Sequence, residues 1–282
     1  MLSEAFKKHL TEICNARIEE IKPLSGGDIN AVYKIKTAAE DLVIKVNSAS
    51  KFPKMFELEA LGLDHIANSN SFITPKVFTT STFRDQSFIL LEFLESGAKS
   101  TDFPERFGHQ LAKMHRTTDK FGFEKDNYIG SLPQYNTVEH NAVDFYINQR
   151  LEPQFKMAFD CGYSFKKLEK FYATISKLIP DEPAALIHGD LWSGNYMVGK
   201  TGEPILIDPA TCYAPREMDI ALMHLFGGFD SELFVQYNAH FPLANDWEER
   251  IRLWQLYYVL VHVNLFGGNY YASAKAVLDD YL

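Results

Sequence analysis

Two kinds of hydrophobic periodicity occupy different parts of the chain. In the first third, an alternating pattern that follows a glycine pair predicts a strand within 24–36, and short apolar runs predict strands over 41–46, 75–78 and 87–94. Helical spacing predicts one helix before these strands, over 1–20, and another among them, over 52–67. From residue 104 onwards helical patterns dominate, most clearly over 104–118 and 247–266. Because strands and helices are segregated along the chain, we predict an α+β fold with two lobes.

A polar stretch, 95–102, separates these two parts and is predicted to be a linker. We therefore assign residues 1–94 to an N-lobe, a sheet with one inserted helix, and residues 95–282 to a mainly helical C-lobe. Clefts between such units are common ligand sites, so residues 92–96 are predicted to border a binding cleft.

The most informative stretch is 186–198, where two apolar runs enclose the pattern His-Gly-Asp-x-x-x-x-Asn. Asp190 and Asn195 belong to this pattern, and Asp208 follows in the apolar segment Ile-Leu-Ile-Asp-Pro. Phosphoryl transfer needs an aspartate that orients an acceptor hydroxyl and takes its proton, and an asparagine and a second aspartate that hold Mg²⁺. The alternative is a buried strand–turn–strand whose polar residues only satisfy turn geometry.

Lys45 lies inside an apolar strand, where a lysine is normally excluded unless it is paired. It is a candidate for the cation that holds ATP phosphates and is fixed by a glutamate of the following helix. Glu57 and Glu59 are both candidates for that glutamate, and periodicity alone does not choose between them. The alternative for Lys45 is an edge-strand position that points to solvent.

Two further segments could contact a nucleotide. Gly26 and Gly27 precede a strand, and a glycine pair there lets backbone N–H groups approach phosphates. An ordinary hairpin turn explains the same pair, since it matches no established phosphate-binding motif. In the predicted cleft, an adenine ring would bond to backbone groups of Glu92, Phe93 and Leu94.

Composition limits the classes of partner. The 282 residues include 28 basic and 37 acidic ones, for a formal net charge of −9, with no concentrated run of Lys and Arg. Nucleic-acid and anionic-membrane surfaces need such a concentration, so neither partner is predicted. ATP is not excluded, because a few placed cations and a metal suffice to hold its phosphates.

The cysteines and the apolar segments indicate a cytoplasmic protein. Cys14, Cys161 and Cys212 form neither a disulfide framework nor a zinc site by their number and spacing, so free thiols of a reducing cytosol are expected. The N-terminal segment lacks the apolar core of a signal peptide. The longest apolar segment, 256–266, is too short to span a bilayer.

The distance from Asp208 to the next motif argues against a protein kinase. Only Thr211 to Pro215 separate the segment that ends at Ala210 from Arg216. A protein kinase needs a long segment here to position a peptide and carry a regulatory phosphate, and Gly189 replaces the arginine that would bind that phosphate. A small acceptor, or a small adduct on a larger molecule, fits better.

Together these residues resemble the fructosamine (ketosamine) kinases, which are protein-kinase-like and related to aminoglycoside phosphotransferases. The resemblance covers nearly the whole chain and rests on the segments 26–30, 43–45, 55–60, 121–136, 188–195, 216–219 and 265–270. Trp192-Ser193 distinguishes the chain from aminoglycoside and choline kinases, which usually have His-Pro there. The segment after Asn136 departs from the family pattern by lacking tryptophans, which bears on substrate choice.

The resemblance implies a bilobal protein-kinase-like fold with a small antiparallel N-lobe sheet and a helical C-lobe. It implies that ATP and Mg²⁺ are used to phosphorylate a ketosamine, at O3, on a small amine or a protein lysine, after which the unstable product frees the amine. It assigns Glu59 to Lys45 and makes Asp190 the general base, with Asn195 and Asp208 as metal ligands.

The resemblance leaves some roles open. Trp192 either stacks on the substrate or is a core indole. Asp219 is expected to brace the catalytic loop, and His115 to be a hydrogen-bonded core residue rather than a ligand. Two alternative functions remain, namely a kinase for an aminoglycoside, choline-like molecule or free sugar, and a non-catalytic nucleotide-binding module. Nothing in the sequence indicates the oligomeric state.

Overall fold

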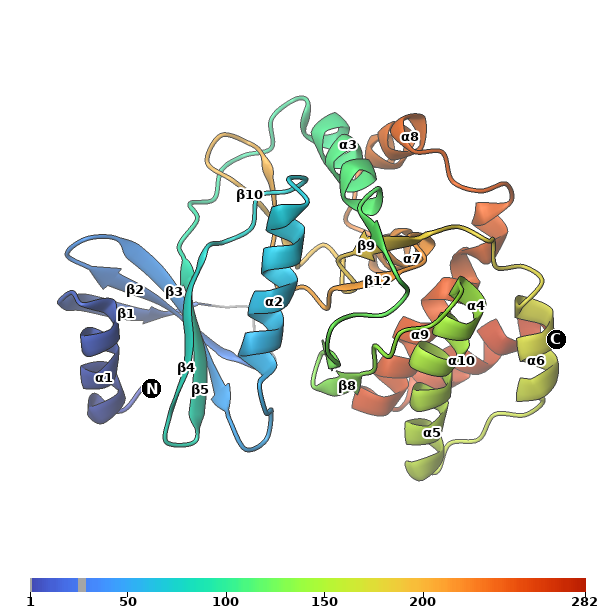
Figure 1. The fold of residues 1–282 in the computed structure, drawn as a ribbon, viewed down its shortest axis with the longest axis horizontal. Coiled ribbons are helices and arrows are strands. Elements are labelled where there is room, and N and C mark those ends of the chain that lie inside the picture. Colours follow the sequence, from blue (N-terminus) through green and yellow to red (C-terminus); the bar gives the residue numbers. More distant parts are fainter. Residues whose placement is uncertain (1, 25–28) are drawn as a thin grey trace.

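The first part of the chain forms a five-stranded antiparallel sheet with a helix on each face (Figure 1). The computed structural model describes residues 2–24 and 29–282. The strands, in the spatial order β1-β2-β3-β5-β4, are β1 Ile18–Pro23, β2 Ala31–Thr37, β3 Asp41–Ser48, β4 Val77–Phe83 and β5 Gln86–Glu92. The helices are α1 Glu4–Cys14 and α2 Met55–Asn68. The predicted antiparallel N-lobe sheet with an inserted helix is therefore confirmed.

The alternation of side chains along β3 determines what each face of the sheet presents. Ile44 packs against Phe6 of α1 in one apolar cluster, whereas Val43 packs against Phe56 of α2 in another. Successive residues of a strand point to opposite faces. Lys45 therefore shares the α2 face with Val43, and β3 lies between β2 and β5, so the edge-strand alternative for this lysine is wrong.

The predicted helix over residues 1–20 is wrong in its second half. Helix α1 ends at Cys14, and Asn15 follows in the left-handed conformation with φ 45°. Ile18 instead begins β1 and pairs with Thr37 of β2. The isoleucines at 18 and 21 have helical spacing, but a strand here satisfies the backbone groups of β2, and this tertiary pairing outweighs the local pattern.

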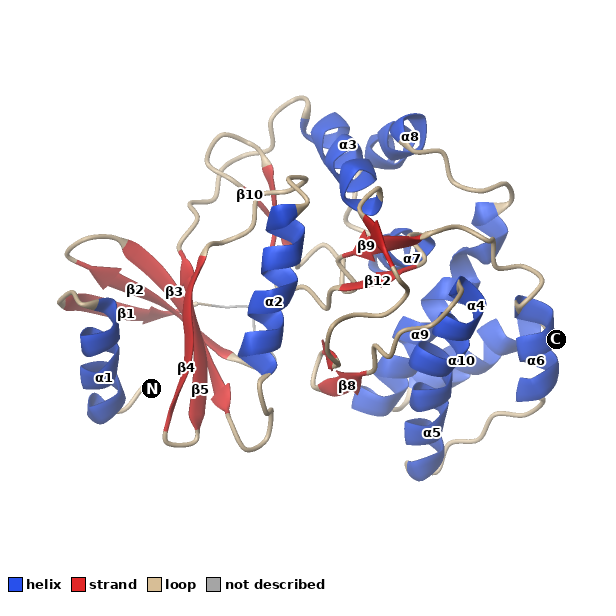
Figure 2. Cartoon of the chain, in the orientation of Figure 1, coloured by secondary structure: helices blue, strands red, loops and turns tan. Residues whose placement is uncertain are grey.

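The second part of the chain is mainly helical, as predicted (Figure 2). Its helices are α3 Phe103–His115, α4 Ala142–Asp144, the π-helix η1 Phe145–Leu151, α5 Glu152–Asp160, α6 Leu168–Ile175, α7 Glu217–Phe226, α8 Ser231–His240, α9 Trp247–Phe266 and α10 Asn269–Asp280. Helix α9 is apolar on most of its surface and runs through the core, where Trp254, Leu256 and Leu260 are fully buried. Among the described helices, none combines the length and apolar composition that a bilayer crossing requires.

Short strands carry the polar motifs between these helices. They are β6 Thr118–Asp119, β7 Asn127–Ile129, β8 Leu132–Gln134, β9 Ala184–Ile187, β10 Tyr196–Val198, β11 Pro204–Leu206 and β12 Cys212–Ala214. Strand β9 pairs with both β6 and β12, and β10 forms a hairpin with β11. The motif 186–198 thus leaves one buried strand and enters another, and its polar residues occupy the loop between them.

The chain passes from the sheet to the helical part between the end of β5 at Glu92 and the start of α3 at Phe103. This segment contains the predicted linker, and it supports our proposed division into residues 1–94 and 95–282. Ser96 forms an isolated bridge with Gly199, so the connection also touches the β10–β11 hairpin.

Candidate active site

A cavity of about 600 Å³ brings five of the eleven predicted site residues together. Glu59 of α2 lines it from the first lobe, and Asp190, Asn195 and Asp208 line it from the second. Ile29 and Asn30, the described end of the predicted phosphate loop, also line it, whereas Gly26 and Gly27 fall outside the described residues.

The three residues predicted to bind adenine, Glu92, Phe93 and Leu94, do not line this cavity. The Glu92 N–H donates to the carbonyl of Lys76 at 2.9 Å and is not available to a ligand. Adenine binding here stays a prediction, with the backbone N–H groups of Phe93 and Leu94 as its donors.

Lys45 is held between two carboxylates. Its Nζ lies 2.6 Å from Oε1 of Glu59, and it also contacts Oδ1 of Asp208. The side chains of Lys45 and Glu59 are only 8% and 10% exposed, so the pair is shielded from water. Glu57, the other candidate, is exposed to solvent. The lysine therefore connects the sheet, α2 and the segment that follows β11.

The backbone of the catalytic loop is fixed by Asp219 of α7. The Asp219 carboxylate accepts hydrogen bonds from the N–H groups of His188, at 2.8 Å, and Gly189, at 2.9 Å. The expected bracing role of Asp219 is confirmed by these contacts. A carboxylate that accepts two backbone N–H groups forms charge-assisted bonds, which are stronger than neutral ones.

His188 fixes the other side of the loop as a neutral imidazole. Its Nε2 donates to the carbonyl of Ile207 at 2.9 Å, so Nδ1 is left as an acceptor for the N–H of Asp190 at 3.2 Å. Burial lowers the pKa of His188, which favours this neutral form. The histidine thus ties Asp190 to the strand that leads to Asp208.

Gly189 is required by the close approach of two backbone segments. Its φ is +81°, in the region that favours glycine, and a Cβ atom there would collide with the carbonyl oxygen of Ala210. The arginine that a protein kinase carries at this position could not fit. The sequence predicted only that Gly189 lacks a phosphate-binding side chain, and the structure adds this steric reason.

We expect Gly189→Ala to lower the free energy of unfolding by about 3 kcal/mol, because it combines a strained φ with a backbone collision. Gly162→Ala is the matched control, since Gly162 has φ +87° but no heavy atom within 4 Å of the place that a Cβ atom would take. That control should lose only about 1 kcal/mol. Urea unfolding of the two variants measures the difference, and equal losses would contradict the collision.

Asp190 combines burial with a single strong hydrogen-bond donor. Burial raises the pKa of its carboxyl to about 7, and the hydrogen bond from Asn195 opposes that rise. Asn195 Nδ2 donates both to Oδ2 of Asp190, at 3.0 Å, and to its backbone carbonyl, at 2.8 Å. A carboxylate with a pKa near neutrality is suited to general-base catalysis.

Asn195 and Asp208 offer oxygen atoms that suit a magnesium ion. The amide nitrogen of Asn195 is committed to Asp190, which leaves its Oδ1 as a potential ligand. Asp208 has φ +55°, and its side chain is 37% exposed. Mg²⁺ takes hard oxygen ligands and is commonly held by one or two carboxylates together with substrate phosphates. Among the described residues, no cluster of three or more His, Cys, Asp or Glu is placed to hold a metal ion.

Buried amide side chains support the segment that follows Asp208. Asn127 Nδ2 donates to the carbonyl of Thr211 at 2.9 Å, and Gln134 Nε2 donates to that of Ala210 at 3.0 Å. Gln134 in turn accepts a hydrogen bond from the hydroxyl of Tyr257 on α9, at 2.8 Å. The sequence marked this loop only through the family resemblance and did not reveal its supporting role.

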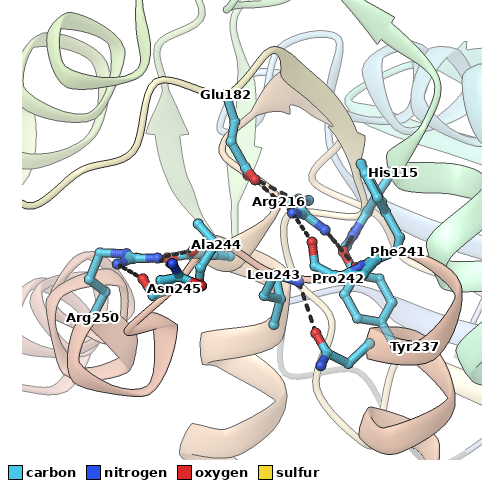
Figure 3. A network of polar contacts seen from close by, with 12 residues as sticks. His115, Glu182, Arg216, Tyr237, Phe241, Pro242, Leu243, Ala244, Asn245 and Arg250 are labelled. Atoms are coloured by element: carbon cyan, nitrogen blue, oxygen red, sulfur yellow. Dashed lines mark hydrogen bonds and ion pairs between the residues drawn. The ribbon is translucent and has the colours of Figure 1, made fainter.

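A second polar network joins the start of α7 to the segment before β9 and to the segment that follows α8 (Figure 3). Arg216 is 3% exposed and binds Glu182 through two hydrogen bonds of 2.9 and 2.7 Å. It also donates to the carbonyl of Pro242 at 2.7 Å. His115 and Tyr237 hydrogen-bond to each other at 2.9 Å, so the expectation that His115 is a satisfied core residue is confirmed.

Trp192 lies at the surface of the cavity rather than in the core. Its side chain is 42% exposed, and its ring covers Gly194 closely enough to exclude a Cβ there. The core-indole alternative is therefore wrong. Three more exposed aromatic residues of α7, α9 and α10 line the same cavity, namely Phe226, Phe266 and Tyr270.

The chain matches proteins of known class over nearly its whole length. The family described as "Fructosamine kinase" matches residues 2–282. A "Probable ketoamine kinase" of Synechocystis is 36% identical over 94% of this chain and 91% of its own. The chloroplastic protein-ribulosamine 3-kinase of Arabidopsis thaliana is also 36% identical, over 97% of this chain and 86% of its own.

Solved structures agree with these matches. A structure assigned as a fructosamine-3-kinase from Thermobifida fusca has a TM-score of 0.87 and 31% identity, covering 99% of this chain and 98% of its own. A spectinomycin phosphotransferase solved with ADP has a TM-score of 0.63, with 99% of this chain and 94% of its own covered. At 12% identity, this second likeness concerns the fold alone.

Proposed function

Because the chain belongs to the fructosamine kinase family, we propose that it uses ATP to phosphorylate a sugar hydroxyl of fructosamine or ribulosamine adducts. The protein is thus a phosphotransferase, and the predicted bilobal protein-kinase-like fold is confirmed. One observation carries the proposal, namely that Lys45 contacts both Glu59 and Asp208 beside the cavity that Asp190 and Asn195 also line.

In the proposed reaction, Asp190 orients the acceptor hydroxyl and takes its proton as the hydroxyl oxygen attacks the γ-phosphorus of ATP. The bond from the γ-phosphorus to the bridging oxygen breaks, and ADP leaves. Its raised pKa supports this role, because a base near neutrality both exists in the charged form and accepts a proton readily. Lys45 neutralises charge on the phosphates, and Glu59 keeps its ammonium group in place.

Asn195 and Asp208 would hold Mg²⁺ through Oδ1 and the carboxylate. When bound, the ion would neutralise phosphate charge. The hydrogen bond from Asn195 Nδ2 to Asp190 would keep the proton acceptor and the metal-binding amide in a fixed relation. This part of the proposal rests on the chemistry of the two side chains.

The acceptor is proposed to be a ketosamine, free or on a protein lysine, phosphorylated at O3. The naming of a relative as a protein-ribulosamine 3-kinase supports both the sugar and the position. Phosphorylation at O3 would give a product that decomposes and frees the amine, so the reaction would reverse glycation. Trp192, exposed at the cavity two residues after Asp190, is proposed to stack on the substrate.

The alternatives have less support. An aminoglycoside acceptor would require an acidic pocket, but the acidic residues that line the described cavity are Glu59, Asp190 and Asp208. The proposed reaction already uses all three, for the phosphates and for the attacking hydroxyl. A non-catalytic module would be expected to lack at least one of the reactive residues, and all four are present, namely Lys45, Asp190, Asn195 and Asp208. A cytoplasmic location also belongs to the proposal, since the three cysteines are free thiols in the structure.

A coupled assay of ADP release tests the proposed function. We expect ATP-dependent turnover with fructosyl-lysine and ribulosyl-lysine, and at least about 100-fold lower kcat/KM for aminoglycosides, choline and free ketoses, as the loss of several substrate contacts predicts. Mass spectrometry of the sugar product locates the phosphate. Turnover of an aminoglycoside with no turnover of any ketosamine would contradict the proposal.

A further inference from the structure

The face of α9 that lines the cavity carries two polar side chains that no step described above uses. This α9 wall consists of Tyr258, Val261, His262, Leu265 and Phe266, all of which line the cavity. Tyr258 and His262 are four residues apart, so they lie one above the other on the same side of the helix. The remaining residues of the wall are apolar, which makes these two side chains its only hydrogen-bonding groups.

The Tyr258 hydroxyl is buried without a partner. The residue is 2% exposed, and no group of the described chain hydrogen-bonds to its oxygen. Its neighbour Tyr257 is equally buried but donates to Gln134. A buried polar group that lacks a partner costs about 1–3 kcal/mol, so such groups are rare unless a ligand or water completes them. Burial raises the pKa of Tyr258 well above its usual value, so the group remains a neutral donor.

His262 is oriented so that one ring nitrogen stays available. Its Nδ1 lies 2.8 Å from the carbonyl of Tyr258, and because a carbonyl only accepts, Nδ1 carries the proton. In the neutral ring Nε2 is then an acceptor, and no residue in the described parts of the chain bonds to it. Tyr258 and His262 are therefore linked through this backbone contact.

Aromatic rings surround the imidazole of His262. The ring centroids of Tyr270, Phe226 and Phe266 lie 4.9, 5.1 and 5.6 Å from its centroid. The α9 wall contains no carboxylate. A cation that reached it would be bound by aromatic faces and by a neutral nitrogen, as happens where ammonium groups meet aromatic residues.

We propose that the α9 wall recognises the acceptor, with the Tyr258 hydroxyl binding a sugar oxygen next to the reacting hydroxyl and His262 Nε2 accepting a hydrogen bond from the protonated secondary amine. This inference rests on the proposed function, and it adds the residues that distinguish a ketosamine from a free ketose. The amine is the feature that a free ketose lacks. It lies near the hydroxyl that Asp190 would deprotonate, because both are attached to the same end of the sugar. The rings of Phe226, Phe266 and Tyr270 would then contact the alkyl chain that carries the amine.

The first test removes the Tyr258 hydroxyl with Tyr258→Phe. We expect the KM of a ketosamine and the inhibition constant of the free ketose both to rise about tenfold, since both would lose one hydrogen bond. The KM for ATP should not change, and the melting temperature should not fall, because the hydroxyl has no partner in the described chain to lose. Tyr172→Phe is the matched control, because the Tyr172 hydroxyl is also buried but lies on α6, outside the cavity.

The second test replaces the imidazole by a ring of similar shape with His262→Phe. We expect the KM of fructosyl-lysine to rise about tenfold while the inhibition constant of free fructose stays within about twofold, because only the ketosamine carries the amine. His224→Phe is the control, since His224 is exposed on α7 and stacks on Phe234 instead of facing the cavity.

The outcomes separate this inference from the function on which it rests. If the unaltered enzyme phosphorylates no ketosamine, the proposed function itself is wrong. If it does so and both variants keep their KM values, the α9 wall is only part of the core and the inference fails alone. Equal effects of His262→Phe on fructosyl-lysine and fructose would overturn the amine contact. A fall in melting temperature with unchanged KM would indicate a purely structural role and would likewise contradict it.

Discussion

Replacing Asp190 by asparagine is expected to lower kcat for a ketosamine by about 10³-fold, within the range that general-base catalysis contributes. Asparagine has nearly the same volume, so the loop held by Asp219 and His188 should keep its geometry. What is lost is a carboxylate that can take the proton of the attacking hydroxyl. Nucleotide binding should survive, because Lys45, Asn195 and Asp208 are unchanged.

Two measurements check this expectation. Coupled ADP release with fructosyl-lysine gives kcat, and the shift in melting temperature with added ATP reports nucleotide binding. Asp64→Asn is a suitable control, because Asp64 is an exposed residue of α2 outside the cavity and its loss should leave kcat unchanged. Full activity of Asp190→Asn would show that another group accepts the proton.

Lys45→Met is expected to raise the KM for ATP about tenfold and to lower kcat about 100-fold, the effect of removing one group that stabilises charge in the transition state. Methionine fills the space of the apolar stem but carries no charge. Glu59 and Asp208, which both contact the ammonium group, would then face each other without a cation between them. Like charges that lie close together repel, and although the partly exposed Asp208 weakens this repulsion, Glu59 is largely shielded from water. We therefore also expect a lower melting temperature.

Two glutamate variants on α2 provide the comparison for Lys45→Met. Glu59→Gln should reproduce part of the loss in kcat, because the lysine keeps its charge but loses the group that positions it. Glu57→Gln, on the same helix but exposed to solvent, should have no effect. Wild-type kinetics in Lys45→Met would mean that another group binds the phosphates, and equal effects of the two glutamate variants would remove the assignment of Glu59.

Local patterns predicted most of the fold because they report which face of each element is buried. The apolar runs of β3 and β5 and the helical spacing of α2, α3 and α9 correspond directly to the apolar clusters of the structure. The helix predicted over 1–20 failed beyond Cys14, because Ile18 continues the apolar spacing of Phe6, Leu10 and Ile13 and fits a helix and a strand alike. Only the presence of β2 decides between them, and that information is not local.

The chemistry of the site was predicted better than its support. Asp190, Asn195 and Asp208 stand in short motifs, so their types and spacing indicate phosphoryl transfer directly. Asn127 and Gln134 act on backbone groups that are distant in the sequence, and no local pattern shows such contacts. Tyr258 and His262 sit in a helix whose apolar residues resemble an ordinary core segment. The unpartnered hydroxyl becomes visible only when its surroundings are known.

The short segment after Asp208 has a consequence for the regulation of activity. Residues 211–214 are largely buried: Thr211 is not exposed at all, and β12 pairs with β9 beside the catalytic loop. Switchable kinases depend on a segment at this place that is ordered in one state and released in another. A strand fixed in a sheet has no second state for a signal to favour. We therefore expect an enzyme that is always active, whose rate in the cell depends only on the concentrations of its ketosamine substrate and of ATP.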